Sequence, residues 1–395
     1  MTRYALGWYP GSSAQIELFR PEESQGGNYQ LKYTSPMRPT LRPPSAPYLL
    51  GPAELDPINE SLDALAAAQG GRGGADPDPG APTAPAPAAV AAMAARMAVL
   101  GDQLFVLMIP TELRPDLRVA GAFLELGVDE MLLGYPWELM HDGEEFLCLK
   151  HNLGRFVNAR QGVGAGPARA STPASGSDLS VLIISVPKPN ARGGGLPYRE
   201  LPQVQAETTA VVAALQAQGI AATLLAGQAA MYDAVVDALK RHYDIIHFAG
   251  HGSFNQADPG SSSIALWDKD MRPGPIRGFF GRSAPTFCFI NACESARVAG
   301  GAAAPAGWKE RYDIFGIGRA FLETGSYLLG SRWPIADAPA AAFATEFYTQ
   351  LLAEKPLGEV VRAARVACQK ASAGDDMAWA SYIFYGDPRV RFNRV

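Results

Sequence analysis

Apolar and polar positions follow one pattern in the first part of the chain and another after about residue 180. In the first part, strict alternation over Ala14–Phe19 and Tyr29–Tyr33 predicts a β-hairpin. A helical spacing of apolar residues covers Ala88–Leu113, and the pattern of Glu145–Val157 favours short strands. The first part is therefore predicted to be a small mixed α+β region.

After about residue 180, short apolar segments rich in β-branched residues alternate with amphipathic segments. The predicted strands are Ser180–Val186, Ala221–Leu225, Tyr243–Ala249, Ser263–Trp267, Thr286–Ile290, Ser326–Gly330 and Ser381–Tyr385. The predicted helices are Gln203–Gln218, Ala229–Arg241, Ile314–Glu323, Ala340–Leu352 and Leu357–Ala373. This alternation is typical of an α/β fold whose mostly parallel sheet is sandwiched by helices. In such sheets ligands bind at the carboxyl ends of the strands.

Glycine and proline, at 41 and 32 residues, are concentrated in a few stretches. Ala66–Val90 consists almost entirely of Ala, Gly and Pro and is predicted to be a flexible insertion. A similar stretch at Gln161–Asp178 separates two parts that each have apolar segments of their own. We therefore expect an N-terminal region over residues 1–160, a linker over 161–178 and a second domain over 179–395.

Charge and cysteine content narrow the class of protein. The 34 Lys and Arg residues against 39 Asp and Glu give a net charge of −5, which disfavours direct nucleic-acid binding. No apolar run is long enough for a membrane span, and the N-terminal residues lack the pattern of a secretion signal. The four cysteines include no Cys-x-x-Cys pair, so we expect a reduced, cytoplasmic setting. Phosphate-loop and zinc motifs are missing, so we expect no cofactor and no metal.

Two of the predicted strands are followed by residues whose side chains can take part in catalysis. His251 lies just past one apolar strand, and Cys293 lies just past another. A thiol with a pKa of about 8.5 needs a neighbouring imidazole to act as a nucleophile at neutral pH. Gly250 and Gly252 flank the histidine, which lets a substrate approach the backbone and lets the Gly252 N–H face a developing oxyanion.

Each of these residues on its own is more often structural. A single histidine at a strand end usually serves packing, and a cysteine in an apolar context is usually buried and inert. Cys288 and His247 lie within the same two strands and are predicted to be part of the core. The combination of His251 and Cys293 therefore carries the functional prediction.

Several separated motifs of the second part resemble one known family. They are YDIIHFAGHGSF (Tyr243–Phe254), SSSIALWD (Ser261–Asp268), FCFINACESARVAG (Phe287–Gly300), GSYLLGSRWPIAD (Gly325–Asp337) and WASYIFYGDP (Trp379–Pro388). In this order and spacing the sequence resembles the CHAT domain of caspase-like cysteine peptidases, the clan of caspases, separases and gingipains. The upstream PWELMHDGEEFLCL (Pro136–Leu149) resembles the segment that precedes the peptidase half in this family.

The resemblance implies a caspase-like fold over residues 179–395, preceded by a pseudo-caspase-like N-terminal region. It implies a dyad of His251 and Cys293, with the backbone N–H groups of Gly252 and Cys293 as the oxyanion hole. The implied function is a cysteine endopeptidase that cleaves a specific partner protein, as a regulated bacterial effector in defence or cell death. The substrate is expected to be encoded in the same operon, and a separate activator or sensor protein is expected. The alternative is a catalytically silent scaffold or interaction module.

The segment after Ser326–Gly330 is a candidate for substrate binding. Arg332 in the pocket would favour an acidic residue before the cleaved bond, whereas Asp337 would favour a basic one. The structural alternatives are that Trp333 forms a wall, that Arg332 points to solvent and that Asp337 caps the following helix. The sequence does not decide between a role in substrate binding and a structural role for these three residues.

Overall fold

The structure is a computed structural model of the chain, and its description covers most of the second half and the helices and strands of the first. The described residues are 3–8, 14–19, 30–34, 52–67, 87–111, 113–129, 132–158, 177–190, 198–255, 258–280, 284–293, 295–297, 316–371 and 377–394. Most of the predicted linker and most of the predicted insertion at 66–90 lie outside these residues.

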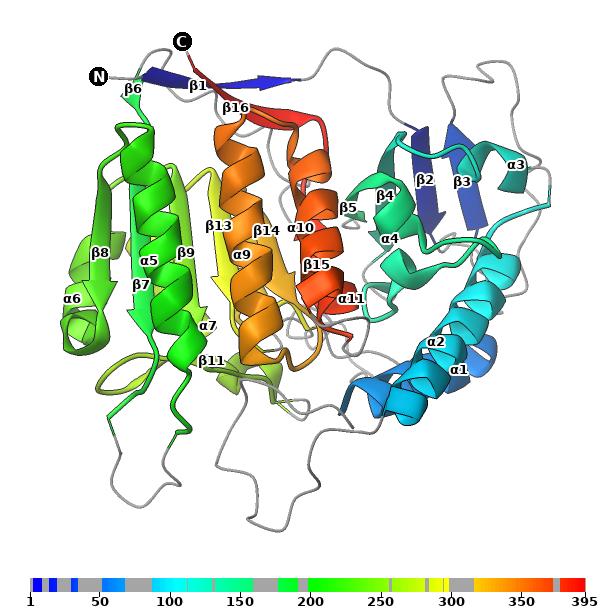
Figure 1. Cartoon of the computed structure of the whole chain (residues 1–395), viewed down its shortest axis with the longest axis horizontal. Coiled ribbons are helices and arrows are strands. Elements are labelled where there is room, and N and C mark those ends of the chain that lie inside the picture. The colour runs from blue at the N-terminus through cyan, green and yellow to red at the C-terminus, as the bar shows by residue number, and fades with distance from the viewer. Residues whose placement is uncertain are drawn as a thin grey trace.

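The centre of the fold is one large sheet (Figure 1). Within the described residues it has ten strands in the order β3-β2-β4-β5-β15-β14-β13-β9-β7-β8. Their bounds are β2 Ala14–Phe19, β3 Gln30–Thr34, β4 Phe123–Asp129, β5 Asn152–Asn158, β7 Val181–Val186, β8 Ala222–Ala226, β9 Ile245–Gly250, β13 Phe287–Asn291, β14 Tyr327–Ser331 and β15 Tyr382–Tyr385. Neighbouring strands are parallel except in the pairs β2–β3 and β14–β15. The mostly parallel sheet predicted from the apolar strands is confirmed.

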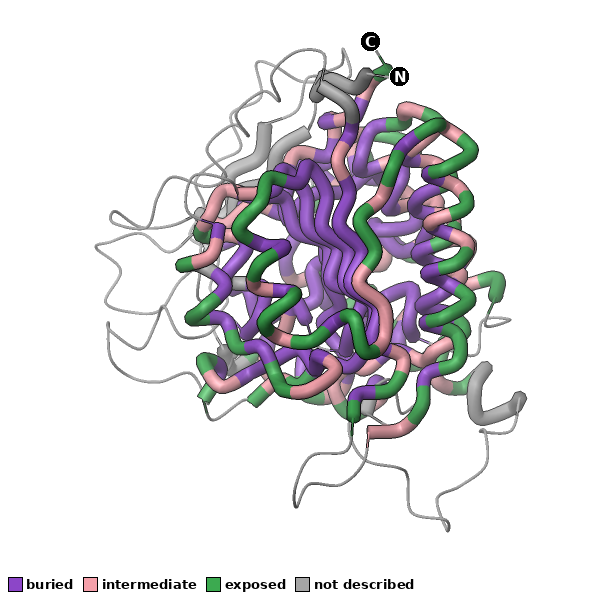
Figure 2. Tube along the Cα trace, turned by 90° about the vertical axis from the view of Figure 1, so that its left-hand side faces the viewer, coloured by how far each residue is buried: buried purple, intermediate pink, exposed green. Residues whose placement is uncertain are grey.

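Helices cover both faces of this sheet. One layer consists of α5 (Pro202–Ala217), α9 (Asp337–Leu352) and α10 (Leu357–Ala371). The other consists of α6 (Tyr232–Leu239), α7 (Pro273–Phe280) and α8 (Gly318–Leu322). In Figure 2 the buried strands run between helical layers. Such a sheet is apolar on both faces, which explains why its strands are continuous hydrophobic runs in the sequence.

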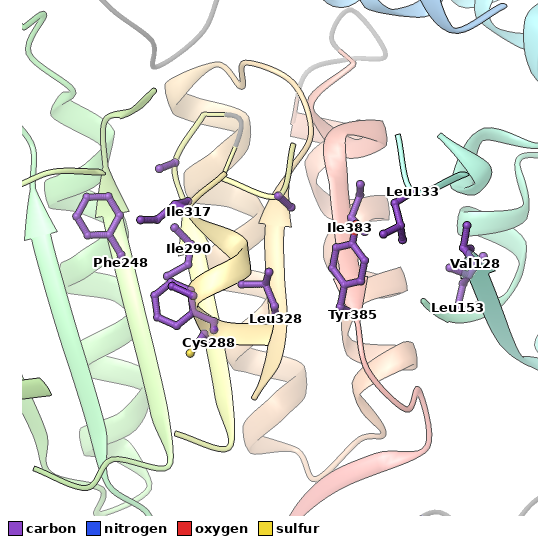
Figure 3. Packing of buried hydrophobic residues seen from close by; sticks show 14 of the residues in the cluster. Val128, Leu133, Leu153, Phe248, Cys288, Ile290, Ile317, Leu328, Ile383 and Tyr385 are labelled. Carbon is purple, nitrogen blue, oxygen red and sulfur yellow. The ribbon is translucent and has the colours of Figure 1, made fainter. Parts of the chain in front are cut away.

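Alternate residues of each strand contribute to two separate cores. Ile184 and Ile290 face the cluster that includes α6, α7 and α8, and part of this cluster is drawn in Figure 3. Ile183 and Phe289 face the cluster that includes α5, α9 and α10. Because side chains alternate along a strand, a shift of one residue in register would exchange the two cores.

Two small sheets complete the strands. Strand β1 (Arg3–Trp8) lies between β16 (Val390–Arg394) and β6 (Ser177–Asp178), so the two ends of the described chain lie together (Figure 1). The second small sheet consists of β10 (Gly252–Ser253), β11 (Ser263–Ala265) and β12 (Asp270–Met271). The strand predicted at Ser263–Trp267 therefore exists in shortened form, outside the large sheet.

The first part of the chain differs most from the sequence predictions. Its helices are α1 (Pro52–Ala67), α2 (Pro87–Met108), α3 (Arg114–Leu117) and α4 (Leu147–Lys150). The short helix α11 (Ala378–Ser381) belongs to the second part of the chain. Helix α1 was not predicted. The predicted helix to Leu113 ends at Met108, shortly before Pro110 and Pro115. The short strands predicted over Glu145–Val157 are in part wrong, because a helical turn, α4, precedes the single strand β5.

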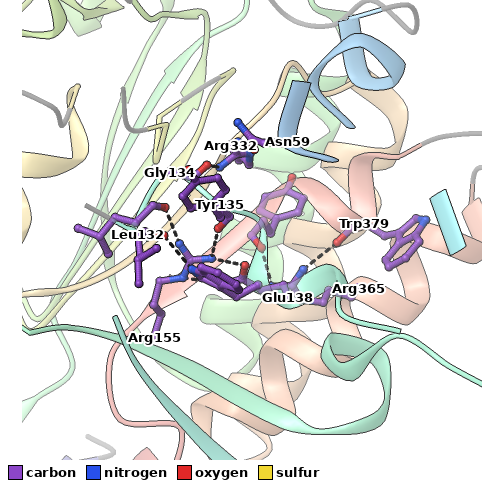
Figure 4. A network of polar contacts seen from close by, with 12 residues as sticks. Asn59, Leu132, Gly134, Tyr135, Glu138, Arg155, Arg332, Arg365 and Trp379 are labelled. Carbon is purple, nitrogen blue, oxygen red and sulfur yellow. Dashed lines mark hydrogen bonds and ion pairs between the residues drawn. The ribbon is translucent and has the colours of Figure 1, made fainter. Parts of the chain in front are cut away.

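A buried polar seam joins the first part of the chain to the second. Strand β5 pairs with β15, so the two predicted halves share one sheet. The guanidinium of Arg155 on β5 lies 5.7 Å from the centre of the Tyr385 ring on β15. Within the first part of the chain, Arg155 forms an ion pair with Glu138 and donates a hydrogen bond to the carbonyl oxygen of Tyr135 (Figure 4). Removing one partner of such a buried ion pair typically costs about 3–5 kcal/mol, so this pair holds the position of Arg155 firmly.

Candidate active site

The two residues predicted to carry the chemistry lie at the same edge of the sheet. Strands β9 and β13 are parallel neighbours, with Ala249 paired to Asn291 at their carboxyl ends. His251 follows β9 and Cys293 follows β13. Both residues are 1% exposed. The topology therefore brings the imidazole and the thiol to one edge from neighbouring strands, where parallel sheets bind their ligands.

Gly252 lies directly against the backbone of Cys293. A Cβ atom at position 252 would overlap the carbonyl oxygen of Cys293 and would come within 3.4 Å of its amide nitrogen. It would also lie 3.0 Å from the Cβ of Ala292. The loop after β9 therefore touches the loop after β13 only because residue 252 has no side chain.

The ring of His251 is held by the segment that precedes α5. Its Nε2 atom lies 2.7 Å from the carbonyl oxygen of Arg199, and the ring of Tyr198 packs against it at 4.9 Å between centroids. Since a carbonyl oxygen can only accept, the hydrogen bond requires the proton of the neutral ring on Nε2. Nδ1 is then the ring nitrogen that can accept a proton.

The thiol of Cys293 contacts the segment after β14. The N–H group of Ile335 donates to Sγ at 3.4 Å, and Sγ lies 3.9 Å from the carbonyl oxygen of the same residue. Serine side chains fix the turn that carries the cysteine. Ser295 Oγ donates to Ile290 and accepts the N–H of Ser331, whose own Oγ donates to Ala292.

A buried polar cluster lies between the helices and the interior of the same strands. His247 Nε2 is 3.0 Å from Glu207 on α5, and His247 Nδ1 is 3.2 Å from the hydroxyl of Tyr348 on α9. Asn291 donates to Glu207 at 2.7 Å and accepts from Tyr382 at 2.8 Å. Glu207 therefore ties α5 to both strands that end in the candidate site. The pKa of Tyr348 is raised by its burial and by Glu207.

The other cysteines have the character of core residues. Cys288 is buried, as predicted, and burial raises the pKa of its thiol well above the usual value. Burial likewise raises the pKa of Cys148 to about 12. A thiol with such a pKa supplies almost no thiolate at neutral pH.

Arg332 and Trp333 are turned toward the first part of the chain. Arg332 is only 4% exposed, so the alternative that it points to solvent is wrong. Its guanidinium donates to the carbonyl oxygen of Gly134 and to the side chains of Asn59 and Asp63 on α1 (Figure 4 shows Gly134 and Asn59). Trp333 is buried, and its indole N–H donates to Asp63 at 2.5 Å. The desolvation of Arg332 lowers its pKa, and Asp63 opposes that shift.

Asp337 is the first residue of α9, and its carboxylate accepts the N–H of Gln203 at 2.8 Å. The alternative that Asp337 caps α9 is wrong, because Ala336 occupies that position and no side-chain capping bond is made. The carboxylate instead binds an N–H group in the first turn of α5, where backbone donors lack partners within the helix.

Sequence reasoning missed four residues that shape this edge: Tyr198, Arg199, Glu207 and Asp63. Arg199 acts through its carbonyl oxygen, which its side chain does not reveal. Of the four, Glu207 could most easily have been predicted from the sequence, because a carboxylate on the buried face of a predicted helix requires a polar partner. The missed Asp63 lies on the unpredicted helix α1.

Within the described part of the chain, no group of three or more His, Cys, Asp or Glu side chains could hold a metal ion. Of the helices described, none combines the length and the apolar composition that crossing a membrane requires.

Solved structures show which class of fold this is. Separase in the separase–securin complex of Saccharomyces cerevisiae is similar with a TM-score of 0.55 at 12% identity, over 94% of this chain and 30% of the separase chain. The Arg-specific cysteine proteinase gingipain R (RgpB) of Porphyromonas gingivalis matches with a TM-score of 0.42 at 10% identity, over 76% of this chain and 69% of its own. The fold is that of the caspase-like cysteine peptidases.

The family follows from the sequence itself. Residues 99–387 match the CHAT domain, and the chain belongs to the CHAT domain family. The matched range begins in α2 and ends after β15, so it includes the candidate site and much of the first part of the chain. A comparison with curated protein sequences gave no match. The chain spans less than a third of the length of the separase chain to which its fold is similar.

Proposed function

We propose that this protein is a cysteine endopeptidase in which Cys293 is the nucleophile and His251 the general base and acid. The observation that carries the proposal is the position of the two residues at the carboxyl ends of the adjacent parallel strands β9 and β13. The caspase-like fold and the membership of the CHAT family support it.

The proposed reaction follows from the hydrogen bond of the imidazole. Because Nε2 is bound to the Arg199 carbonyl, Nδ1 of His251 accepts the thiol proton of Cys293. The thiolate attacks the carbonyl carbon of a peptide bond, and the protonated Nδ1 then donates its proton to the departing amine. Water hydrolyses the resulting thioester and frees the thiol.

The backbone N–H groups of Gly252 and Cys293 are proposed to bind the oxyanion of the tetrahedral intermediate. Their residues are packed against each other, which supports this pairing. Donors fixed by the fold before the reaction are worth far more than donors that must first be ordered, and removing one typically costs about 10²–10³ in kcat.

We propose that the substrate pocket is lined by Arg332, Trp333 and Asp337. Ile335 lies between Trp333 and Asp337 in sequence and contacts the Cys293 sulfur, which supports a place for this segment beside the cleaved bond. In the separase–securin structure the peptidase is held in a complex with another protein. For this chain we propose a protein substrate encoded in the same operon and a separate activator, for a cytoplasmic effector in bacterial defence or cell death.

The test is cleavage of a candidate partner protein by the wild-type chain and by Cys293→Ala and His251→Ala. Cleavage should fall by at least about 10³-fold in each variant, the order of loss seen when a member of a catalytic unit is removed. Cys288→Ala is the matched control, since it removes a buried thiol from the same strand region and should keep activity. Undiminished cleavage by Cys293→Ala would falsify the assignment of the nucleophile, and absence of cleavage by the wild-type chain would favour the scaffold. Mass spectrometry of the products gives the residue before each cut.

A further inference from the structure

Three donor groups converge on one carboxylate beside the candidate site. Arg332 Nη2 lies 3.2 Å and Trp333 Nε1 lies 2.5 Å from Oδ1 of Asp63. Arg297 Nη2 lies 3.9 Å from Oδ2 of the same residue. We call Arg297, Arg332 and Trp333 the carboxylate cradle. Arg332 of the cradle is drawn in Figure 4 with Asn59, which lies one helical turn before Asp63 on α1.

The cradle belongs to the two loops that hold the candidate nucleophile. Arg297 lies in the segment that follows Cys293, next to Ala296, whose N–H donates to Ser331 at 2.8 Å. Trp333 lies shortly before Ile335, the residue that donates to the Cys293 sulfur, and its side chain packs in the same buried cluster as Cys293. A carboxylate in the cradle is therefore held by the same two loops that position the thiol.

The buried guanidinium of Arg332 is only partly satisfied in the cradle. Its Nη2 pairs with Asp63, and its Nε has no hydrogen-bond partner within the described part of the chain. A guanidinium that is 4% exposed, as in Arg332, needs a carboxylate close by, because an unpaired buried charge is strongly destabilising. The cradle therefore selects an acidic group as its occupant.

Asp63 reaches the cradle from outside the peptidase half. It belongs to α1, whose neighbouring Leu62 and Ile58 are buried and hold the helix in place. The side chain of Asp63 is 29% exposed, against 4% for Arg332. The carboxylate can therefore turn outward to solvent while the apolar contacts keep α1 attached. Helix α1 then loses its hydrogen bonds to Arg332 and Trp333, which should lower the protection of its amides.

We propose that Asp63 is an internal stand-in for an acidic side chain of the substrate, and that it blocks the pocket until a substrate carboxylate replaces it. This inference rests on the proposed peptidase function. It assigns an Asp or Glu residue immediately before the cleaved bond, and it makes α1 an autoinhibitory element. The exchange of one carboxylate for another leaves the charge of the cradle unchanged, so the buried guanidinium of Arg332 stays paired throughout.

The experiment measures how fast Cys293 is alkylated by two peptidyl acyloxymethyl ketones that differ only in Asp or Asn next to the reactive group. In Asp63→Asn the Asp probe should react about tenfold faster than with the wild type, which corresponds to removal of a competitor worth about 1.4 kcal/mol. The Asn probe should change by less than about threefold, or about 0.7 kcal/mol. Arg332→Met should remove the preference for the Asp probe.

Asp56→Asn is the matched control on the same helix. Asp56 accepts a hydrogen bond from Tyr135 at 2.6 Å, and the amide oxygen of Asn can accept it as well, so the variant removes one negative charge from α1 without vacating the cradle. Rates for Asp56→Asn should equal those of the wild type. Equal acceleration of both probes in Asp63→Asn, or the same acceleration in Asp56→Asn, overturns the inference.

A second measurement requires no reaction at Cys293. Hydrogen exchange of the α1 amides is followed in Cys293→Ala as N-acetyl-aspartate methylamide or its asparagine analogue is added at millimolar concentration. Exchange over residues 52–67 should rise with the aspartate compound alone, and unchanged exchange overturns the inference. If neither probe alkylates Cys293 in any variant, the peptidase proposal fails, while this measurement still decides whether the cradle takes an external carboxylate.

Discussion

The interiors and the carboxyl ends of strands β9 and β13 use the same residue types in opposite ways. In the interior, His247 contacts the side chains of Glu207 and Tyr348, and Cys288 is buried with a raised pKa. At the ends, His251 bonds to a backbone carbonyl and Cys293 to a backbone N–H group. His247 and Cys288 are fixed by side chains of the core, whereas His251 and Cys293 are positioned by the main chain of the surrounding loops. This difference separates residues that hold the fold from those proposed to perform chemistry.

The largest effect on the carboxyl-end region is expected from Gly252→Ala. The added Cβ would overlap the Cys293 carbonyl oxygen, so the two loops must move apart. We expect peptidase activity to fall by at least about 100-fold, as when an oxyanion donor is lost. Gly274→Ala on α7 is the control, because nothing lies within 4 Å of a Cβ added there. Kinetics of both variants check this, and equal activities would contradict the proposed role of the contact.

A smaller effect is expected when the turn around Cys293 loses one hydrogen-bonding side chain. Ser295→Ala removes the bonds to Ile290 and Ser331 and should lower activity about tenfold, with a stability loss of about 1–2 kcal/mol. Ser326→Ala removes a comparable buried bond, to Pro285 at 2.7 Å, at the other end of β14. Its stability loss should be similar but its activity per folded molecule unchanged. Urea unfolding and kinetics together separate the two, and an equal loss of activity in both would contradict the account.

The sequence predicted the second part of the molecule far better than the first. Strands β7, β9, β13 and β14 begin and end within two residues of their predicted bounds, because continuous apolar runs between turns leave little choice of structure. Helix α1 was missed because Pro57 interrupts its pattern and the Ala, Gly and Pro stretch follows it closely. Its buried residues Leu55, Ile58 and Leu62 do show helical spacing.

The sequence predicted the two proposed catalytic side chains but not the residues that hold them in position. His251 and Cys293 stand out because parallel sheets bind their ligands at the carboxyl ends of the strands, which the sequence pattern locates. The Arg199 carbonyl and the pairing of Asp63 with Arg332 could not be found in this way. Asp63 and Arg332 lie 269 positions apart, and such a contact follows only from how the chain folds back on itself. Local patterns indicate which residues are buried but not which distant partner they meet.

The most direct test of the central claim is to identify which cysteine reacts with a peptidyl electrophile. The chain has four cysteines, Cys148, Cys288, Cys293 and Cys368, and all of them are buried. Peptide mapping by mass spectrometry of the folded protein should place the adduct on Cys293, and His251→Ala should slow its formation at least about 100-fold. Modification of another cysteine first, or an unchanged rate in His251→Ala, would contradict the assignment of the dyad.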